Sequence, residues 1–302
     1  VDDEDGSIDG IQPGEDGYTE AAIAKAQAIF STITNYPNGF NSEDLQSIIG
    51  LYPNQPVRFF YVENSTIESV NQDNTALEKV IFSNQTAYDL SDLETDGISI
   101  TWNNTNGNSQ PVDLEIKVEE TTDSTDSMIL GTATQNQPEG EVIHLQDIDI
   151  NETVSAEFSV FREASYDNYV GFYEVVDENG GIDITGDGKA DINPGDSNYI
   201  QTAINNRIEG IDLTVDNQGS ATYNSVLDGG SIYAPFIIAN GNPDDVNGSA
   251  NDPEVYFTYL AANSDGQDHI RMLGNNIFGF EDLPNGGDLD YNDMIISAKL
   301  TI

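Results

Sequence analysis

The sequence contains no cysteine and very little positive charge. Its 302 residues include 9 Lys and Arg against 54 Asp and Glu, which gives a formal net charge of −45. Without cysteine, disulfide bonds and thiolate chemistry are excluded. Nucleic acids and anionic membrane surfaces both require a basic patch on the protein. Partners of these two kinds are therefore excluded as well.

The chain is also poor in the residues from which catalytic centres are commonly built. Its two His, His144 and His269, are far apart in the sequence, and it has a single Trp. We find no P-loop, Gly-X-Ser-X-Gly or dinucleotide-binding fingerprint. Two carboxylates would suffice for glycoside hydrolysis, but no pair is accompanied by aromatic platforms for a sugar. We therefore expect a protein that is not an enzyme.

No hydrophobic run approaches the length of a membrane-spanning helix, so membrane insertion is not expected. The chain begins at Val1 without Met or a secretion signal, as we would expect of a processed product. Because so acidic a chain repels itself, it needs either bound Ca²⁺ or the high salt of a halophile. Asp gathers with Gly and Asn in short loops, which favours specific Ca²⁺ sites. We therefore expect a secreted protein at a bacterial cell surface, where free Ca²⁺ is high.

The most informative stretch is FGFEDLPNGGDLDYND, residues 278–293. Its acidic residues lie between an aromatic pair and the apolar run 294–296, and Ca²⁺ prefers six to eight oxygen ligands from such a turned loop. Alternate residues of an extended segment also project to one side. The predicted ligands are Glu281, Asp282, Asp288, Asp290, Asn292 and Asp293. The alternative is a solvated acidic hairpin.

The same stretch resembles the DUF4114 domain. FGFEDL followed by GGDLDYND carries the resemblance, which extends over about residues 155–302 through APFIIAN at 234–240 and HIRMLG at 269–274. This domain is common at the C-termini of large secreted and surface proteins of cyanobacteria and marine bacteria. The resemblance therefore implies a surface protein, but it implies no particular biochemical activity.

A second acidic loop, DITGDGKAD at residues 183–191, follows the spacing of an EF-hand loop. Oxygen donors stand at positions one, three, five, seven and nine, with Gly188 at position six. Position twelve is Pro194 instead of Glu, and an Asp two residues later could replace it. The predicted Ca²⁺ ligands are Asp183, Thr185, Asp187, the carbonyl of Lys189, Asp191 and Asp196. The alternative is a turn without metal.

An internal repeat relates the N-terminus to the middle of the chain. In residues 1–23 and again in 176–204, an acidic Gly loop leads through Pro-Gly to a short helix with Ala and Ile. Residues 57–62 could likewise correspond to 234–238. The N-terminal copy lacks the Gly-Asp-Gly centre of the second acidic loop. The repeat predicts two related modules, of which the first is degenerate.

Short runs of Val, Ile, Phe, Tyr and Thr separated by Asn, Asp and Gly indicate a β-sandwich. We expect a mainly β fold of two jelly-roll-like modules with short helices and Ca²⁺-binding loops, residues 1–150 and 151–302. The second module begins with strands in 154–174 that the first module lacks. The open edge could receive a strand from a neighbouring subunit, or residues 128–150 could fill it within the chain.

These features together predict an extracellular, Ca²⁺-stabilised structural or adhesive protein. We expect a subunit of a surface filament, sheath or surface layer, whose partners are further copies or other surface proteins. Strand donation between subunits could join the copies. The alternative is a Ca²⁺-dependent glycan-binding module of an adhesin. Exposed, incompletely coordinated Ca²⁺ beside an aromatic residue would favour that alternative. Buried, saturated Ca²⁺ and an unpaired strand edge would favour the structural subunit.

Overall fold

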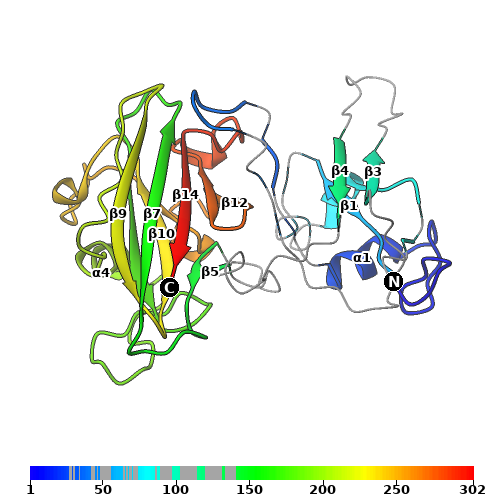
Figure 1. Ribbon diagram of the computed structural model, residues 1–302, viewed down its shortest axis with the longest axis horizontal. Helices are drawn as coiled ribbons and strands as arrows, with labels where there is room; N and C mark the ends of the chain where they lie inside the picture. Colours follow the sequence, from blue (N-terminus) through cyan, green and yellow to red (C-terminus); the bar gives the residue numbers. More distant parts are fainter. Residues whose placement is uncertain are drawn as a thin grey trace. The chain divides into compact units, whose positions relative to one another are not determined.

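The computed structural model is mainly β, as predicted, and divides into two compact units (Figure 1). Unit 1 comprises Val1–Ala28 and Ile49–Asp123, and unit 2 comprises Ile29–Ile48 and Ser124–Ile302. The structure describes residues 1–26, 29, 31–33, 35–41, 45, 47, 56–63, 65, 67, 70, 74–85, 87–88, 97–102, 114–119, 131–132 and 141–302.

These units differ from the predicted division into residues 1–150 and 151–302. The structure assigns residues 29–48, and also residues 124–150, to unit 2. Whether the two units are related modules stays a prediction.

Unit 2 is a sandwich of two antiparallel sheets. Sheet I has the strand order β12-β13-β14-β7-β9, and Figure 1 shows β9, β7 and β14 side by side. Its strands are β7 (Thr153–Arg162), β9 (Ser220–Asp228), β12 (Ile270–Gly274), β13 (Ile277–Phe280) and β14 (Met294–Thr301).

Sheet II is built around β10 (Ile232–Ile238). Because β8 pairs with all seven residues of β10, the partners β11 and β6 share the opposite edge of β10. The surrounding strands are β8 (Tyr169–Val175), β11 (Val255–Phe257), β6 (Ile143–His144) and β5 (Gly131–Thr132), which pairs with β6.

The core of unit 2 lies between the two sheets because alternate strand residues face inward. Along β7, Val154, Ala156, Phe158 and Val160 are buried while their neighbours are more exposed, as the sequence alternation predicts. They pack against residues of β8, β10, β13 and β14. Burial of this apolar surface is the main stabilising term of the sandwich.

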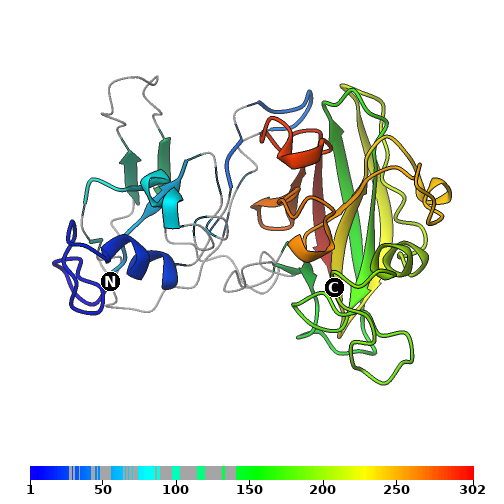
Figure 2. The same cartoon turned by 180° about the vertical axis from the view of Figure 1, so that it is seen from behind.

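Two further layers cover the sandwich. The helix α4 (Tyr199–Asn205) packs on the outer face of sheet II, as Figure 2 shows from behind. On the outer face of sheet I, Ile33 packs with Leu273, Ile277 and Ile295. The Ser31 backbone N–H also donates to the Met272 carbonyl of β12 (3.0 Å). Described parts of residues 29–48 thus cover one edge of sheet I.

The described loops of unit 2 also contain three short 3₁₀ helices. They are η3 (Pro243–Asp245), η4 (Leu260–Ala262) and η5 (Pro284–Gly286).

The described part of unit 1 contains the helix α1 and two small antiparallel sheets, β1-β2 and β3-β4. The elements are α1 (Tyr18–Ala24), β1 (Phe60–Val62), the 3₁₀ helix η2 (Asn74–Lys79), β2 (Val80–Phe82), β3 (Ile98–Trp102) and β4 (Leu114–Val118). Phe60 and Phe82 pack on Tyr18 and Ala22 of α1. Residues 114–118, LEIKV, alternate between apolar and charged side chains, and they form the strand that this alternation predicts.

Candidate metal centre

The loop between β13 and β14 folds back on itself through a run of left-handed backbone conformations. Asn285, Leu289 and Tyr291 have φ of 61°, 61° and 51°. At Gly287 a Cβ atom would lie 2.1 Å from Glu281 Oε1, so only glycine fits there. The Gly-Gly pair of the sequence therefore lets the loop backbone approach the Glu281 carboxylate.

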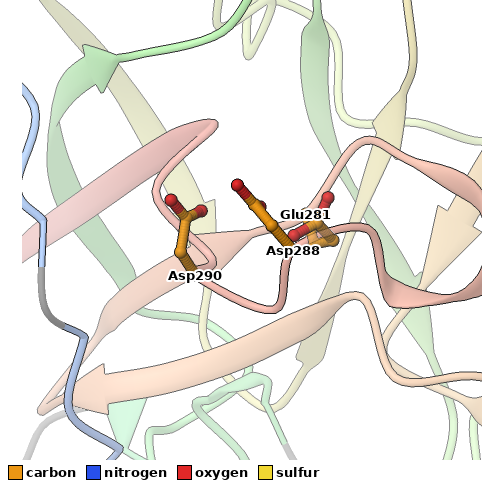
Figure 3. A group of neighbouring side chains, drawn as sticks. All are labelled: Glu281, Asp288 and Asp290. Carbon is orange, nitrogen blue, oxygen red and sulfur yellow. The ribbon is translucent and has the colours of Figure 1, made fainter.

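This fold-back brings five of the predicted ligands into two groups that share Glu281, the first of which is drawn in Figure 3. One group is Glu281, Asp288 and Asp290, and the other is Glu281, Asp282 and Asp293. In each group one oxygen from every carboxylate lies within 4.8 Å of the others. Such converging carboxylates are suited to hold a hard metal ion.

Glu281 is the buried centre of these groups, with none of its side chain exposed. Its Oε1 accepts a hydrogen bond from the Leu283 backbone N–H (3.2 Å), but its Oε2 has no hydrogen-bond partner. A buried carboxylate oxygen without a partner is costly. A cation in the site would supply the missing interaction.

The remaining buried carboxylates are held by nearby amides. The Asp282 backbone N–H donates to Asp293 Oδ2 (2.8 Å), and Asn168 Nδ2 donates to Asp282 Oδ2 (2.6 Å). Asn168 is buried and precedes β8, so it ties this loop to the β7–β8 connection. Asn168 was missed in the sequence because a lone Asn 114 residues away carries no signal.

Burial raises the pKa of several of these carboxyl groups. Desolvation raises the pKa of Glu281 to about 7 and that of Asp293 to about 9, and neighbouring carboxylates add to both shifts. The pKa values of Asp282 and Asp290 are also raised, again chiefly by desolvation. Without a cation, the cluster therefore resists full ionisation near neutral pH.

The predicted ligand Asn292 lies beside the cluster and is buried. Its Nδ2 donates to Asp290 Oδ2 (2.8 Å) and to the Asn35 carbonyl (3.2 Å). In this arrangement the Asn292 amide orients the Asp290 carboxylate and anchors part of residues 29–48.

A buried histidine supports the first residue of the loop. His269 Nδ1 lies 2.9 Å from the Glu281 carbonyl and His269 Nε2 lies 3.0 Å from Asp265 Oδ2. The imidazole stacks on the Tyr256 ring with centroids 3.5 Å apart. Asp265 also accepts the Asn285 backbone N–H (2.7 Å), so the pair fixes both sides of the turn. The sequence marks His269 only through its place in the HIRMLG motif.

The second predicted metal loop has a different arrangement. Asp183 accepts the backbone N–H groups of Gly186 and Gly188 (2.6 Å each), which lowers its pKa. Asp191 accepts from Ile184 and Thr185 (2.8 and 2.9 Å), with the same effect.

Two more predicted ligands of that loop accept backbone bonds. Asp187 Oδ1 accepts the Lys189 N–H (3.1 Å), and Asp196 Oδ2 accepts the Asn193 N–H (2.8 Å). Within the described residues, groups of three carboxylates occur only in the β13–β14 loop. The metal site at residues 183–196 stays a prediction.

The acidic cluster opens into a cleft of ≈ 380 Å³ lined by Asp288, Asp290, Asp293 and Tyr166. A second open cleft of ≈ 630 Å³ shares Tyr166 and Asp282 with it and is lined mainly by polar residues of 240–254. Tyr166 is 38% exposed. The cluster thus has a buried side at Glu281 and a solvent side beside an aromatic ring.

Comparisons with known proteins bear on the segment that carries this loop. Among the helices of the described residues, none combines the length and the apolar character needed to cross a membrane. No curated protein and no solved structure matches the chain. The predicted resemblance is confirmed where the acidic loop lies: residues 227–301 match the model of the DUF4114 family, described as a domain of unknown function.

Proposed function

We propose that this protein is an extracellular, Ca²⁺-stabilised structural or adhesive protein, a subunit of a surface filament, sheath or surface layer. The observation that carries the proposal is the buried Glu281 carboxylate, which has an unpartnered oxygen and belongs to two groups of converging acids. Such a loop is costly to fold alone and favourable to fold around a cation.

The chemistry of the donors favours Ca²⁺ among the common metals. All the side chains that converge are carboxylates, and hard oxygen donors select Ca²⁺, Mg²⁺ or Mn²⁺ over softer ions. Mg²⁺ demands near-ideal octahedral geometry and keeps several waters, whereas Ca²⁺ accepts irregular sets of carboxylates. A loop with several strained φ angles and five acids of unequal burial suits Ca²⁺ better.

A cation here would act as a brace and not as a catalyst. The acids belong to the β13–β14 loop, and Asn168 and Asn292 tie that loop to the β7–β8 connection and to residue 35. Metal binding would therefore lock three separate segments of unit 2. This suits a protein that must persist outside a cell, and we propose a non-enzymatic role on the sequence grounds given above.

The proposal is tested by melting the protein and imaging it with and without Ca²⁺. We expect millimolar Ca²⁺ to raise the melting temperature of unit 2 well above its value in chelator, since a ligand at 100 times its Kd contributes about 2.7 kcal/mol. Mg²⁺ at equal concentration is the control and should stabilise less. Electron microscopy should show ordered assemblies in Ca²⁺ that come apart on chelation. An unchanged melt in chelator would contradict the Ca²⁺ proposal.

A Ca²⁺-dependent glycan-binding module is the second candidate. It is favoured by the exposed Asp288 and half-exposed Tyr166, which line the same cleft on the solvent side of the cluster. Sugars commonly stack on aromatic rings, and an incompletely coordinated ion can take their hydroxyls. A glycan array in Ca²⁺ checks this, with Tyr166→Ala expected to lose binding and Tyr166→Phe to keep it. No Ca²⁺-dependent glycan signal from the native chain would remove this candidate.

A further inference from the structure

The same local contacts occur within unit 1 and within unit 2, at the start of the helix that each unit contains. The Tyr18 hydroxyl donates to the Gly6 carbonyl (2.7 Å), and the Tyr199 hydroxyl donates to the Gly180 carbonyl (2.7 Å). In both units a pair of Ile residues forms an isolated bridge just before the helix. The N-terminal loop and α1 therefore correspond to residues 176–198 and α4.

The strands next to the helices correspond as well. In unit 1 Phe60 of β1 pairs with Phe82 of β2, and in unit 2 Phe236 of β10 pairs with Phe257 of β11. The helix tyrosines pack on the second ring of each pair, with centroid distances of 5.4 Å to Phe82 and 5.5 Å to Phe257. By this register β1 is the counterpart of β10.

The correspondence ends at one edge of β1. In unit 2 this edge of β10 pairs with β8 over seven residues. In unit 1 the Ser83 backbone N–H donates to the Phe59 carbonyl, and Val57 and Tyr88 exchange two backbone hydrogen bonds. Backbone groups alternate between the two edges of a strand, so those of Arg58, Phe60 and Val62 point to the opposite edge.

Within the described residues, a single backbone contact is made at that other edge of β1. It is the Val1 nitrogen, 3.4 Å from the Pro56 carbonyl. This contact occupies the place of Val175 opposite Ile232, the last pair of the β8–β10 ladder. Among the described residues, no strand lies at this edge in the position that β8 fills in unit 2.

Arg58 occupies the position in unit 1 whose counterpart in unit 2 faces β8. It corresponds to Ala234, which pairs with Tyr173 of β8. Tyr173 Oη lies 2.8 Å from Tyr199 Oη, and in unit 1 Arg58 Nη1 instead donates to the Tyr18 hydroxyl (2.7 Å). The Arg58 Nε is buried and has no partner.

The described residues of 128–150 do not fill this edge within the chain. Residues 131–132 and 143–144 form β5 and β6, which belong to sheet II of unit 2. That part of the predicted alternative is therefore used elsewhere in the fold.

Unit 2 carries an unpaired edge of its own, at β9. The Gly229 N–H donates to the Glu152 carbonyl (2.9 Å), and this bond shows which residues of β9 direct their backbone groups toward β7. Thr222, Asn224 and Val226 therefore direct their backbone groups away from β7, and these groups have no backbone partner among the described residues. At the opposite edge of the sheet, the Ser31 backbone N–H donates to a carbonyl of β12.

The β9 edge also lacks the features that normally protect an edge strand. Its nine residues, SATYNSVLD, include no Lys and no Pro, and the only charge is Asp228 at the end. Val226 is 58% exposed. Long uncharged edges of this kind readily pair with another chain.

We propose that copies of this chain join head to tail, with the free edge of β1 in one copy pairing with the free edge of β9 in the next. Each edge offers three residues with outward backbone groups, which are residue 58 before β1 with 60 and 62 on it, and 222, 224 and 226 on β9. Because two different surfaces meet, the contact is heterologous, and it builds a filament when the rotation between copies does not close a ring. This inference deepens the proposed role as a polymer subunit and rests on it.

The absence of native cysteine gives a direct test. Single-cysteine variants Val62→Cys and Asn224→Cys are mixed in Ca²⁺ under mild oxidation, with Thr222→Cys and Val226→Cys as alternatives for the register. Paired strands bring opposite Cα atoms to about 4.5–5.5 Å, within reach of a disulfide. We expect cross-linked dimers from the mixture at least about tenfold above a control mixture with Ile184→Cys, an exposed loop position.

Dimers formed mainly by Val62→Cys alone would show like edges pairing and overturn the head-to-tail contact. Filaments without cross-links would overturn it while leaving the proposed polymer role intact. Protein that stays monomeric in Ca²⁺ would overturn both. A double variant that cross-links only within one chain would show that the edge is filled in cis.

A second variant acts through the backbone. Val226→Pro removes one outward N–H from β9 without touching the ladder to β7, and edge strands tolerate such a proline. Compared with Val226→Thr, it should weaken association in sedimentation by about tenfold with an unchanged monomer melt. Equal association of the two variants would contradict the proposal.

Discussion

Replacing Glu281 by Gln should stabilise the metal-free protein and abolish its response to Ca²⁺. The side chain is fully buried, and desolvation raises the pKa of its carboxyl from 4.5 to about 7. In the folded state without metal, ionising this group is therefore unfavourable. Gln keeps the shape and can still accept the Leu283 N–H through its carbonyl oxygen, but it carries no charge.

The sign and size of the expected change in folding stability follow from the linkage between proton binding and folding. Between pH 4.5 and 7 the folded protein binds the proton of Glu281 more tightly than the unfolded chain does, so its stability is present at low pH and is lost as the pH rises. At about 1.4 kcal/mol for each tenfold change in proton binding, the loss at pH 8 is about 3 kcal/mol. For a unit of this size, that corresponds to about 6–12 °C in melting temperature.

The assay is differential scanning calorimetry at pH 4 and pH 8, in chelator and in millimolar Ca²⁺. In chelator, Glu281→Gln should melt above the native protein at pH 8 and close to it at pH 4. In Ca²⁺ the native protein should gain stability and the variant should gain little. Glu157→Gln, at an exposed position of β7, makes the same charge change and should leave both responses unaltered.

The reasoning would be refuted if Glu281→Gln melted at or below the native temperature at pH 8 in chelator while keeping its full rise with Ca²⁺. Together these results would mean that the buried carboxylate is satisfied without a cation and that Ca²⁺ stabilises the protein without Glu281.

Three further predictions concern the sites and the helix loops. Asp288→Ala and Asp187→Ala should each remove part of the Ca²⁺-dependent rise in melting temperature, and an unaltered rise in Asp187→Ala would count against the loop at 183–191. His269→Gln should weaken Ca²⁺ binding by about tenfold in calorimetric titration, because the ring holds the Glu281 carbonyl; unchanged affinity would assign His269 to packing alone. Tyr199→Phe leaves the buried Gly180 carbonyl without its donor and should cost about 1–3 kcal/mol in denaturant unfolding of unit 2. Tyr18→Phe should have the same effect on unit 1 if the two loops are equivalent.

The acidic cluster could be predicted because most of it is local in sequence. Glu281 to Asp293 span one loop, and the Gly-Gly pair signals that its backbone can fold back on a carboxylate. The separation of the cluster into two groups that share Glu281 could not be predicted, because it depends on the left-handed residues of the turn. The burial that raises the pKa of Glu281 depends on the tertiary packing around the loop.

The partners that hold the cluster could not be read from the sequence. Asn168 and His269 come from other connections of unit 2, and residue 35 comes from near the N-terminus. A single Asn or His has no periodicity or spacing to mark it. Only the packing of distant segments brings such residues to one loop.

From the sequence alone we could predict the mainly β fold, the lack of disulfides and basic surfaces, the acidic loop, and the similarity of residues 1–23 to residues 176–204. These properties depend on composition and on neighbours in the chain, which act over a few residues. The tertiary structure alone decided that residues 29–48 belong to unit 2 and which strand edges have partners. Sheet pairing joins residues far apart in sequence, so the edges of β1 and β9 that have no strand partner among the described residues can be identified only in the tertiary structure.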